Sequence, residues 1–250
     1  MSAGAPGWLT ARPIAHRGLH DAAAGRIENT LGAAEAAIAQ DFAIEFDVQL
    51  TADGEAVVFH DSTLDRLMQG TGAVAERSVA ELQALRFRGS DERVPTLRQF
   101  LARVAGRVPL ICEIKSHFDG DMRLADCTSA VAADYPGQVA LKSFDPAVIA
   151  HLRAAGADRP LGIIAEASYE GDYWRGLSAE QKQSCAAFLH YPETRPDFLS
   201  WNVDDLPHPT PTLLRALASM PVMVWTVTTP EQRQRAKRWA DQIVFDGAPD

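Results

Sequence analysis

Residues 43–61, AIEFDVQLTADGEAVVFHD, contain two apolar runs separated by an Asp-Gly pair at 53–54. The Asp-Gly pair is a strong signal for a two-residue turn, and the stretch is too short to hold a helix. We therefore predict that the chain folds back here, in a β-hairpin-like connection between the second and third strands, with Asp47 opposite His60. Residues two apart share a strand face, so Glu45 and Asp47 are expected to point the same way, beside His60.

Similar β-rich runs recur along the whole chain. They are PIAH (13–16), AIEFDVQL (43–50), EAVVFH (55–60), PLICEIK (109–115), QVALKSF (138–144), LGIIA (161–165), FLSWNV (198–203), VMVWTV (222–227) and QIVFD (242–246). Several are apolar almost throughout, which is typical of strands covered on both faces. Helix signals lie between them, including capping-box spacings at Ser78–Glu81, Thr96–Gln99 and Ser178–Gln181.

This alternation predicts an α/β fold with a parallel sheet. Eight or nine strands in 250 residues favour a closed (β/α)8 TIM barrel over an open doubly wound sheet. We predict a single barrel domain over residues 1–250, with residues 1–9 as a loose lead-in. Spacing alone leaves open whether the return run, 55–60, belongs to the barrel wall or is an additional arm.

Composition limits the class of partner and compartment. The formal net charge of −9 argues against nucleic acid or an anionic membrane surface as the main partner. Cys112, Cys127 and Cys185 show no CxxC spacing and are interpreted as reduced thiols of a cytoplasmic protein. We expect no secretory signal, because the first residues lack a basic segment followed by a long apolar run. We expect no integral membrane association, because no 18-residue apolar stretch occurs. The oligomeric state is not indicated.

Charged side chains gather at the C-terminal ends of the apolar runs, where barrel enzymes build their sites. If the barrel closes, these residues converge: His16, Arg17, Glu45, Asp47, His60, Asp61, Glu113 and Lys115. Three carboxylates placed together repel one another unless a cation lies among them. Carboxylate oxygens favour a hard ion, so one divalent cation, Mg²⁺ or Ca²⁺, is expected there in preference to zinc.

The same set of residues suits chemistry at a phosphate. A guanidinium such as Arg17 binds an oxyanion through two nitrogens, and Lys115 adds a point charge. Two histidines on opposite sides of phosphorus can move a proton in each direction, from the attacking oxygen and to the leaving alkoxide. His16 and His60 are the candidates for that pair.

Several motifs in order resemble the glycerophosphodiester phosphodiesterases. They are HRG (16–18), ENT (28–30), the hairpin stretch 45–61, CEIK (112–115), SF (143–144), WTV (225–227) and FDGAP (245–249), and the resemblance runs from about Ile14 to Pro249. It implies a (β/α)8 barrel that hydrolyses small glycerophosphodiesters, the deacylated phospholipids, to glycerol 3-phosphate and an alcohol.

The resemblance also implies a role for each matching residue. His16 and His60 become the catalytic pair, and Glu45, Asp47 and Glu113 the ligands of the divalent metal. Arg17 and Lys115 become phosphate contacts, with Glu28 and Trp225 lining the site.

The chain departs from the family pattern at four places. Ile27 replaces a proline, Lys142-Ser143 a serine pair, Thr228 an asparagine, and Phe245-Asp246 the closing Thr-Asp. We expect the last three to bear on the leaving alcohol more than on the chemistry.

Other interpretations remain open at this point. The chain could be a related lipid phosphodiesterase acting on lysophospholipids or sphingomyelin, a metal-dependent amide or C–N hydrolase in which histidines bind zinc, or a non-catalytic binding barrel. Single residues also have ordinary explanations: His20 is expected to be a bystander, Arg66 to be structural, and Glu28 to favour the next helix N-terminus. His117 is a weak further candidate.

Overall fold

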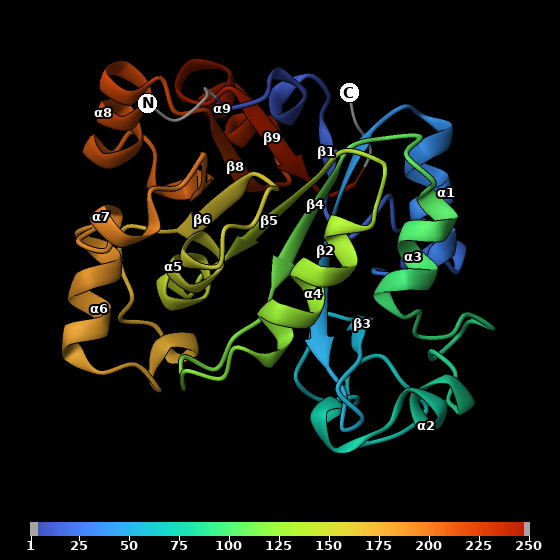
Figure 1. The fold of residues 1–250 in the computed structure, drawn as a ribbon. Coiled ribbons are helices and arrows are strands. Elements are labelled where there is room, and N and C mark those ends of the chain that lie inside the picture. The colour runs from blue at the N-terminus through green and yellow to red at the C-terminus, as the bar shows by residue number, and fades with distance from the viewer. Residues whose placement is uncertain (1–4, 248–250) are drawn as a thin grey trace.

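The computed structural model describes residues 5–247 of the chain, and in them nine strands and nine α-helices alternate. The strands are β1 (Ile14–Ala15), β2 (Ala43–Leu50), β3 (Ala56–Val58), β4 (Leu110–Ile114), β5 (Val139–Ser143), β6 (Leu161–Ala165), β7 (Phe198–Asn202), β8 (Val222–Val227) and β9 (Gln242–Phe245). All except β3 are parallel to their neighbours, and β1 pairs with both β2 and β9, which closes an eight-stranded barrel (Figure 1). The predicted barrel is confirmed.

Helices surround the barrel (Figure 1). They are α1 (Leu31–Ala39), α2 (Val79–Ala84), α3 (Leu97–Val104), α4 (Arg123–Ala133), α5 (Pro146–Ala154), α6 (Ala179–Ala186), α7 (Tyr191–Thr194), α8 (Pro209–Ala218) and α9 (Pro230–Trp239). The three predicted capping boxes are all formed, at the N-termini of α2, α3 and α6. A side-chain oxygen there accepts the backbone N–H that the first helical turn leaves unpaired.

The hairpin forms as predicted, but its register differs by one residue. Strand β3 lies outside the barrel wall and pairs antiparallel with β2 only. Val48 is opposite Val58, and Phe59 N donates to Asp47 O over 3.0 Å, so Asp47 faces Phe59 and not His60. The physical reason is the loop: Thr51 N donates to Glu55 O, which leaves three residues in the turn instead of two.

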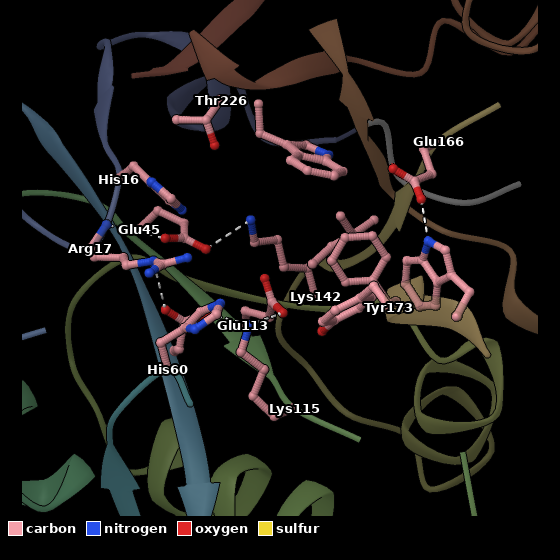
Figure 2. Close-up of a pocket in the computed structure, with 15 residues that line it drawn as sticks. His16, Arg17, Glu45, His60, Glu113, Lys115, Lys142, Glu166, Tyr173 and Thr226 are labelled. Atoms are coloured by element: carbon pink, nitrogen blue, oxygen red, sulfur yellow. Dashed lines mark hydrogen bonds and ion pairs between the residues drawn. The ribbon is translucent and has the colours of Figure 1, made fainter. Parts of the chain in front are cut away.

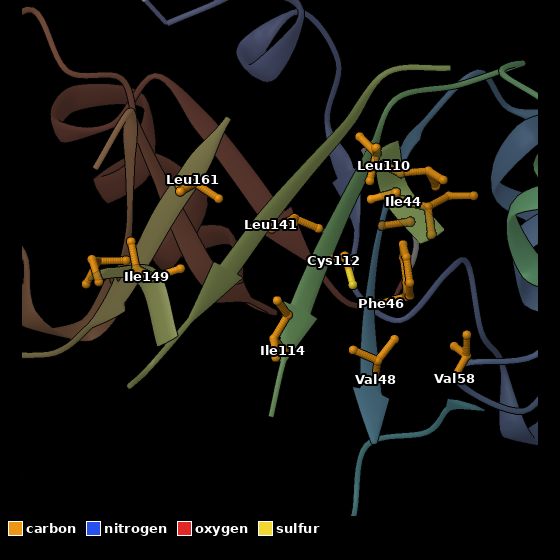
Figure 3. Close-up of a cluster of buried hydrophobic side chains, with 14 of the residues drawn as sticks. Ile44, Phe46, Val48, Val58, Leu110, Cys112, Ile114, Leu141, Ile149 and Leu161 are labelled. Atoms are coloured by element: carbon orange, nitrogen blue, oxygen red, sulfur yellow. The ribbon is translucent and has the colours of Figure 1, made fainter. Parts of the chain in front are cut away.

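The barrel has an outer and an inner layer of apolar side chains because strand residues alternate between faces. Outward-facing side chains of β2, β4, β5 and β6 pack against the helices (Figure 3), and they include Ile44, Phe46, Val48, Leu110, Cys112, Ile114, Leu141 and Leu161. The alternate residues form a second cluster inside the barrel, at its N-terminal end: Ile14, Ala43, Ile111, Ala140, Phe198, Met223 and Val244.

The prediction that residues 1–9 form a loose lead-in is wrong for residues 5–9, the part that the structure describes. Residues Gly7–Thr10 form a 3-10 helix, η1, and Leu9 is buried with the inner apolar cluster of the barrel. Leu9 fills the N-terminal end of the barrel, a role that composition alone does not reveal. Residues 1–4 lie outside the described residues.

Candidate active site

A pocket of about 270 Å³ opens at the C-terminal ends of the barrel strands. Eight of the nine predicted site residues line it: His16, Arg17, Glu45, Asp47, His60, Glu113, Lys115 and Trp225. Figure 2 shows the labelled members converging on one pocket: His16, Arg17, Glu45, His60, Glu113 and Lys115. The ninth, Glu28, lies behind Arg17 and does not line the pocket.

The inner face of the barrel explains why these residues meet. Four of them, together with Lys142 and Asp246, follow a member of the inner apolar cluster by two residues, and so share its face. The pairs are Ile14 and His16, Ala43 and Glu45, Ile111 and Glu113, Ala140 and Lys142, Met223 and Trp225, and Val244 and Asp246. Along five of these six strands the inward-facing side chains thus change from apolar to ionisable in one step, and β8 continues with Trp225.

Three buried carboxylates form the floor of the pocket. Oxygen atoms of Glu45, Asp47 and Glu113 lie within 4.8 Å of one another, and the residues are 1%, 1% and 6% exposed. Burial alone would raise the pKa of Asp47, but the positive charges of Lys115, His60 and Arg17 outweigh it and hold that pKa well below its usual value. Asp47 is therefore ionised, and the three carboxylates can serve as oxygen ligands for a hard divalent cation.

Two lysine side chains balance these carboxylates. Lys115 Nζ lies 2.7 Å from Asp47 Oδ1 and 2.5 Å from Glu113 Oε1. Lys142 Nζ lies 3.0 Å from Glu45 Oε1, and both of these side chains are buried. Lys142 was expected to face the leaving alcohol; it belongs to the carboxylate cluster instead, because Ala140 and Lys142 both point into the barrel.

His16 is held by a carboxylate from the last strand. Asp246 Oδ1 accepts hydrogen bonds from His16 Nδ1 at 3.0 Å and from His20 Nε2 at 3.1 Å. Burial would raise the pKa of Asp246, but the two histidines outweigh it and lower that pKa. Because an ionised carboxylate only accepts, His16 carries its hydrogen on Nδ1 and keeps Nε2 free. His20, expected to be a bystander, shares this network.

His60 has a matching arrangement on the hairpin side. Its Nδ1 lies 2.7 Å from Asp61 Oδ1, and Arg66 Nε donates to Asp61 Oδ2 at 2.7 Å. Arg66 also donates to Glu28, which accepts from Arg17 Nη1 at 2.6 Å. One continuous chain of charge-assisted hydrogen bonds therefore links the two sides of the pocket and fixes the orientation of Arg17.

Asn29 holds the carboxylate of Asp47 in position. Its Nδ2 donates to Asp47 Oδ2 at 2.9 Å, and its Oδ1 accepts from Asp47 N at 3.1 Å. Thr30 is the actual N-cap of α1. The ENT motif was the signal that could have identified Asn29.

The far side of the pocket is aromatic. It is lined by Phe144, Ile164, Glu166, Tyr173, Trp174 and Trp225. Trp174 and Tyr173 come from the 3-10 helix η4 (Asp172–Trp174), in the loop after β6. His117 lies outside this pocket, in a neighbouring depression that shares His60, Lys115, Tyr173 and Trp174.

Comparison with known proteins places this barrel in a family. Residues 16–248 match the model of the glycerophosphoryl diester phosphodiesterase family. Glycerophosphodiester phosphodiesterase 1 of Bos taurus is 33% identical over 154 residues, which cover 56% of this chain and 44% of that protein. The glycerophosphodiester phosphodiesterase of Caldanaerobacter subterraneus is 38% identical over 113 residues, which cover 41% of this chain and 44% of that protein. The chain thus spans less than half the length of these curated relatives.

A solved structure shares the whole barrel. It is an Oleispira antarctica phosphodiesterase in complex with the product sn-glycerol-3-phosphate, with a TM-score of 0.77 at 20% identity, covering 95% of this chain and 93% of that chain. At this identity the likeness shows the fold. The match over residues 16–248 shows more: the chain belongs to the glycerophosphoryl diester phosphodiesterase family.

Proposed function

We propose that this chain is a phosphodiesterase that hydrolyses glycerophosphodiesters to glycerol 3-phosphate and an alcohol. One observation carries the proposal: a single pocket contains two histidines and a buried triad of carboxylates. Each histidine is fixed through Nδ1 by an aspartate, and basic side chains lie beside the triad. Family membership supports the same reaction. The substrate is a small molecule.

His16 and His60 supply acid–base catalysis. Each has its Nδ1 engaged by a carboxylate, which leaves Nε2 as the nitrogen that can exchange a proton. One histidine accepts the proton of the attacking oxygen, and the other donates a proton to the departing alkoxide. Asp246 and Asp61 hold the rings and stabilise the imidazolium that forms.

Arg17 and Lys115 hold the phosphate. Arg17 Nε is buried without a hydrogen-bond partner, and Asp47 Oδ2 lies 3.5 Å away from it. An unsatisfied guanidinium nitrogen in a pocket suits an oxyanion. Glu28 orients Arg17 from behind, and Trp225, whose Nε1 donates to Ser200 O at 3.1 Å, forms part of the wall.

Glu45, Asp47 and Glu113 would hold one divalent cation, Mg²⁺ or Ca²⁺. Their all-oxygen chemistry and mutual spacing fit such an ion. When bound, the cation would stabilise negative charge on the phosphate oxygens. Arg17 and Lys115 keep the anion beside the carboxylates and offset their repulsion.

The geometry favours this reaction over a zinc-dependent amide or C–N hydrolase. Both catalytic histidines already engage carboxylates through Nδ1, and the only group of three possible ligands within the described residues is the carboxylate triad.

The helices within residues 5–247 are too short or too polar to cross a membrane. A cytoplasmic location is retained as a prediction; all three cysteines are unpaired in the structure.

A substrate panel tests the proposal. Glycerol 3-phosphate release is measured with glycerophosphocholine, glycerophosphoethanolamine and glycerophosphoglycerol, and choline or phosphocholine release with lysophosphatidylcholine and sphingomyelin. We expect turnover of the glycerophosphodiesters alone. Turnover restricted to the acylated lipids would contradict the proposal in favour of a lipid phosphodiesterase, and the absence of all turnover would favour a binding barrel.

A further inference from the structure

We propose that the aromatic side of the pocket, centred on Glu166, selects a cationic alcohol as the leaving group. The selected chemistry is an ammonium carried near the ester oxygen, as in a choline ester. This inference rests on the proposed phosphodiesterase function and names its substrate class.

The first observation is the position of Glu166 in the barrel. It follows β6 directly and lines the pocket two residues after Ile164. In the closed order β1-β2-β4-β5-β6-β7-β8-β9, β6 lies four strands from β1 in either direction. Glu166 therefore faces the pocket from the side opposite to His16 and Arg17, as Figure 2 shows.

The second observation is that the charge of Glu166 has no cationic partner among the described residues. Its Oε1 accepts from Trp174 Nε1 and its Oε2 accepts from Asn202 Nδ2 at 3.3 Å, and both donors are neutral. The charge that acts on Glu166 is that of another carboxylate, Asp205, whose Oδ2 accepts from Ala167 N at 2.7 Å. The other carboxylates of the pocket all have basic partners.

This difference in cationic partners also appears in the pKa values of Glu166 and Asp47. Burial raises the pKa of Glu166, the carboxylate of Asp205 adds to that rise, and the two neutral donors only partly oppose it. Asp47, although more deeply buried, has a lowered pKa because cations surround it. A half-buried carboxylate that faces a binding pocket without a cation gains stabilisation when a ligand supplies one.

The third observation is the set of aromatic rings beside Glu166. Phe144 packs at 87° to Trp225 with a centroid distance of 5.3 Å, and Tyr173 packs at 89° to Trp174 at 4.6 Å. Phe144 and Trp174 also touch, at 5.1 Å. Tyr173 is 70% exposed and Phe144 and Trp225 line the pocket, so these rings offer surface to a ligand there. The face of an aromatic ring attracts an ammonium, including a quaternary one.

The two sides of the pocket are therefore complementary to a zwitterion. Arg17, Lys115 and Lys142 place positive charge where the phosphate binds, and Glu166 with its neighbouring rings places negative potential where the alcohol binds. A phosphodiester of an amino alcohol matches both ends. An alcohol that carries a carboxylate is repelled by Glu166 and Asp205.

A pair of isosteric substrates tests the inference. The glycerol 3-phosphate diester of choline is compared with the glycerol 3-phosphate diester of 3,3-dimethylbutanol. This second alcohol has the shape of choline without its charge. We expect wild-type kcat/KM to favour the choline ester by about tenfold, and Glu166→Gln to reduce that ratio to about twofold or less. The amide oxygen of Gln still accepts from Trp174 Nε1, and a ratio is insensitive to partial loss of folded protein.

The control variant is Glu170→Gln, an exposed carboxylate four residues away that pairs with Lys182. It should keep the wild-type ratio. A wild-type ratio near one, or a ratio that Glu166→Gln leaves unchanged, would overturn the inference. If neither ester is hydrolysed, the proposed function fails. Binding of choline and of 3,3-dimethylbutanol, measured by quenching of tryptophan fluorescence, then tests the subsite by itself. The inference is overturned if the protein shows no preference for choline, or if Glu166→Gln retains that preference.

Discussion

Lys142 Nζ lies 3.0 Å from Glu45 Oε1 in the floor of the pocket, and the two side chains are 2% and 1% exposed. This buried pair places a fixed positive charge next to one of the three carboxylates that would hold a metal. A divalent cation and an ammonium beside the same carboxylate repel each other, so Lys142 competes with the metal for Glu45.

Lys142→Met is accordingly expected to bind Mg²⁺ or Ca²⁺ more tightly than wild type, by roughly tenfold or more. The variant also leaves Glu45 without its partner, so the metal-free protein should lose thermal stability and regain it when the ion is added. Calorimetric titration and thermal unfolding measure the two effects. Lys237→Met, an exposed lysine on α9, is the control, and unchanged or weaker metal affinity of Lys142→Met would contradict the account.

Asp246→Asn should lower kcat by roughly 10²-fold, part of the 10²- to 10⁴-fold that acid–base catalysis contributes. The amide cannot stabilise an imidazolium on His16 and presents a donor as well as an acceptor. His20→Gln, which removes the other ring on Asp246, should change kcat by less than about threefold. Steady-state kinetics measure both, and an Asp246→Asn enzyme within threefold of wild type would show that His16 needs no carboxylate.

Gly18→Ala tests whether the close packing of Gly18, in the HRG motif, against Ala33 requires a glycine. Gly18 has φ 79°, and an added Cβ would lie 2.9 Å from the backbone carbon of Ala33. Gly54 has φ 81° with open space around it, so Gly54→Ala carries only the conformational cost of about 1 kcal/mol. Gly18→Ala should cost about 1 to 3 kcal/mol more in the free energy of unfolding. Urea denaturation compares them, and equal losses would exclude the steric explanation.

The environment of Asp61 predicts that the free energy of unfolding decreases at acid pH. Burial would raise the pKa of Asp61, but hydrogen bonds from Arg66 and His60 outweigh burial and lower it to about 2. A lowered pKa in the folded state means that this stabilisation is complete above about pH 4 and is lost as the pH falls through about 2. The difference in free energy of unfolding between wild type and Asp61→Asn should shrink as the pH falls from about 4 to about 2. A difference that grows toward low pH would contradict the assignment.

Sequence reasoning succeeded where strand periodicity decides the outcome. Apolar runs alternating with helices predicted the barrel, and the period of two predicted that Glu45, Asp47 and Glu113 share its inner face. The hairpin register was wrong by one residue because the type of turn at 53–54 depends on backbone geometry that an Asp-Gly pair does not determine.

The same periodicity could have placed Lys142 in the pocket and Asp246 beside His16, since each follows an inward apolar residue by two positions. Both were assigned to the leaving alcohol because family motifs were compared residue by residue without considering which face they share. Glu166 could also have been placed there, because it follows the inward-facing Ile164 by two positions. Tyr173 could not be predicted in this way, because it lies in the loop after β6, whose conformation depends on tertiary packing and not on a repeating pattern.

The most direct test of the central claim, that two histidines act beside one metal held by Glu45, Asp47 and Glu113, is glycerol 3-phosphate release from glycerophosphocholine. Wild-type protein is assayed as purified, after treatment with EDTA, and after return of Mg²⁺ or Ca²⁺, together with His16→Ala and His60→Ala. The account predicts that EDTA abolishes activity, that one of the two ions restores it, and that each variant loses at least about 10²-fold while keeping a wild-type circular dichroism spectrum. Full activity after chelation, or a histidine variant as active as wild type, would contradict it.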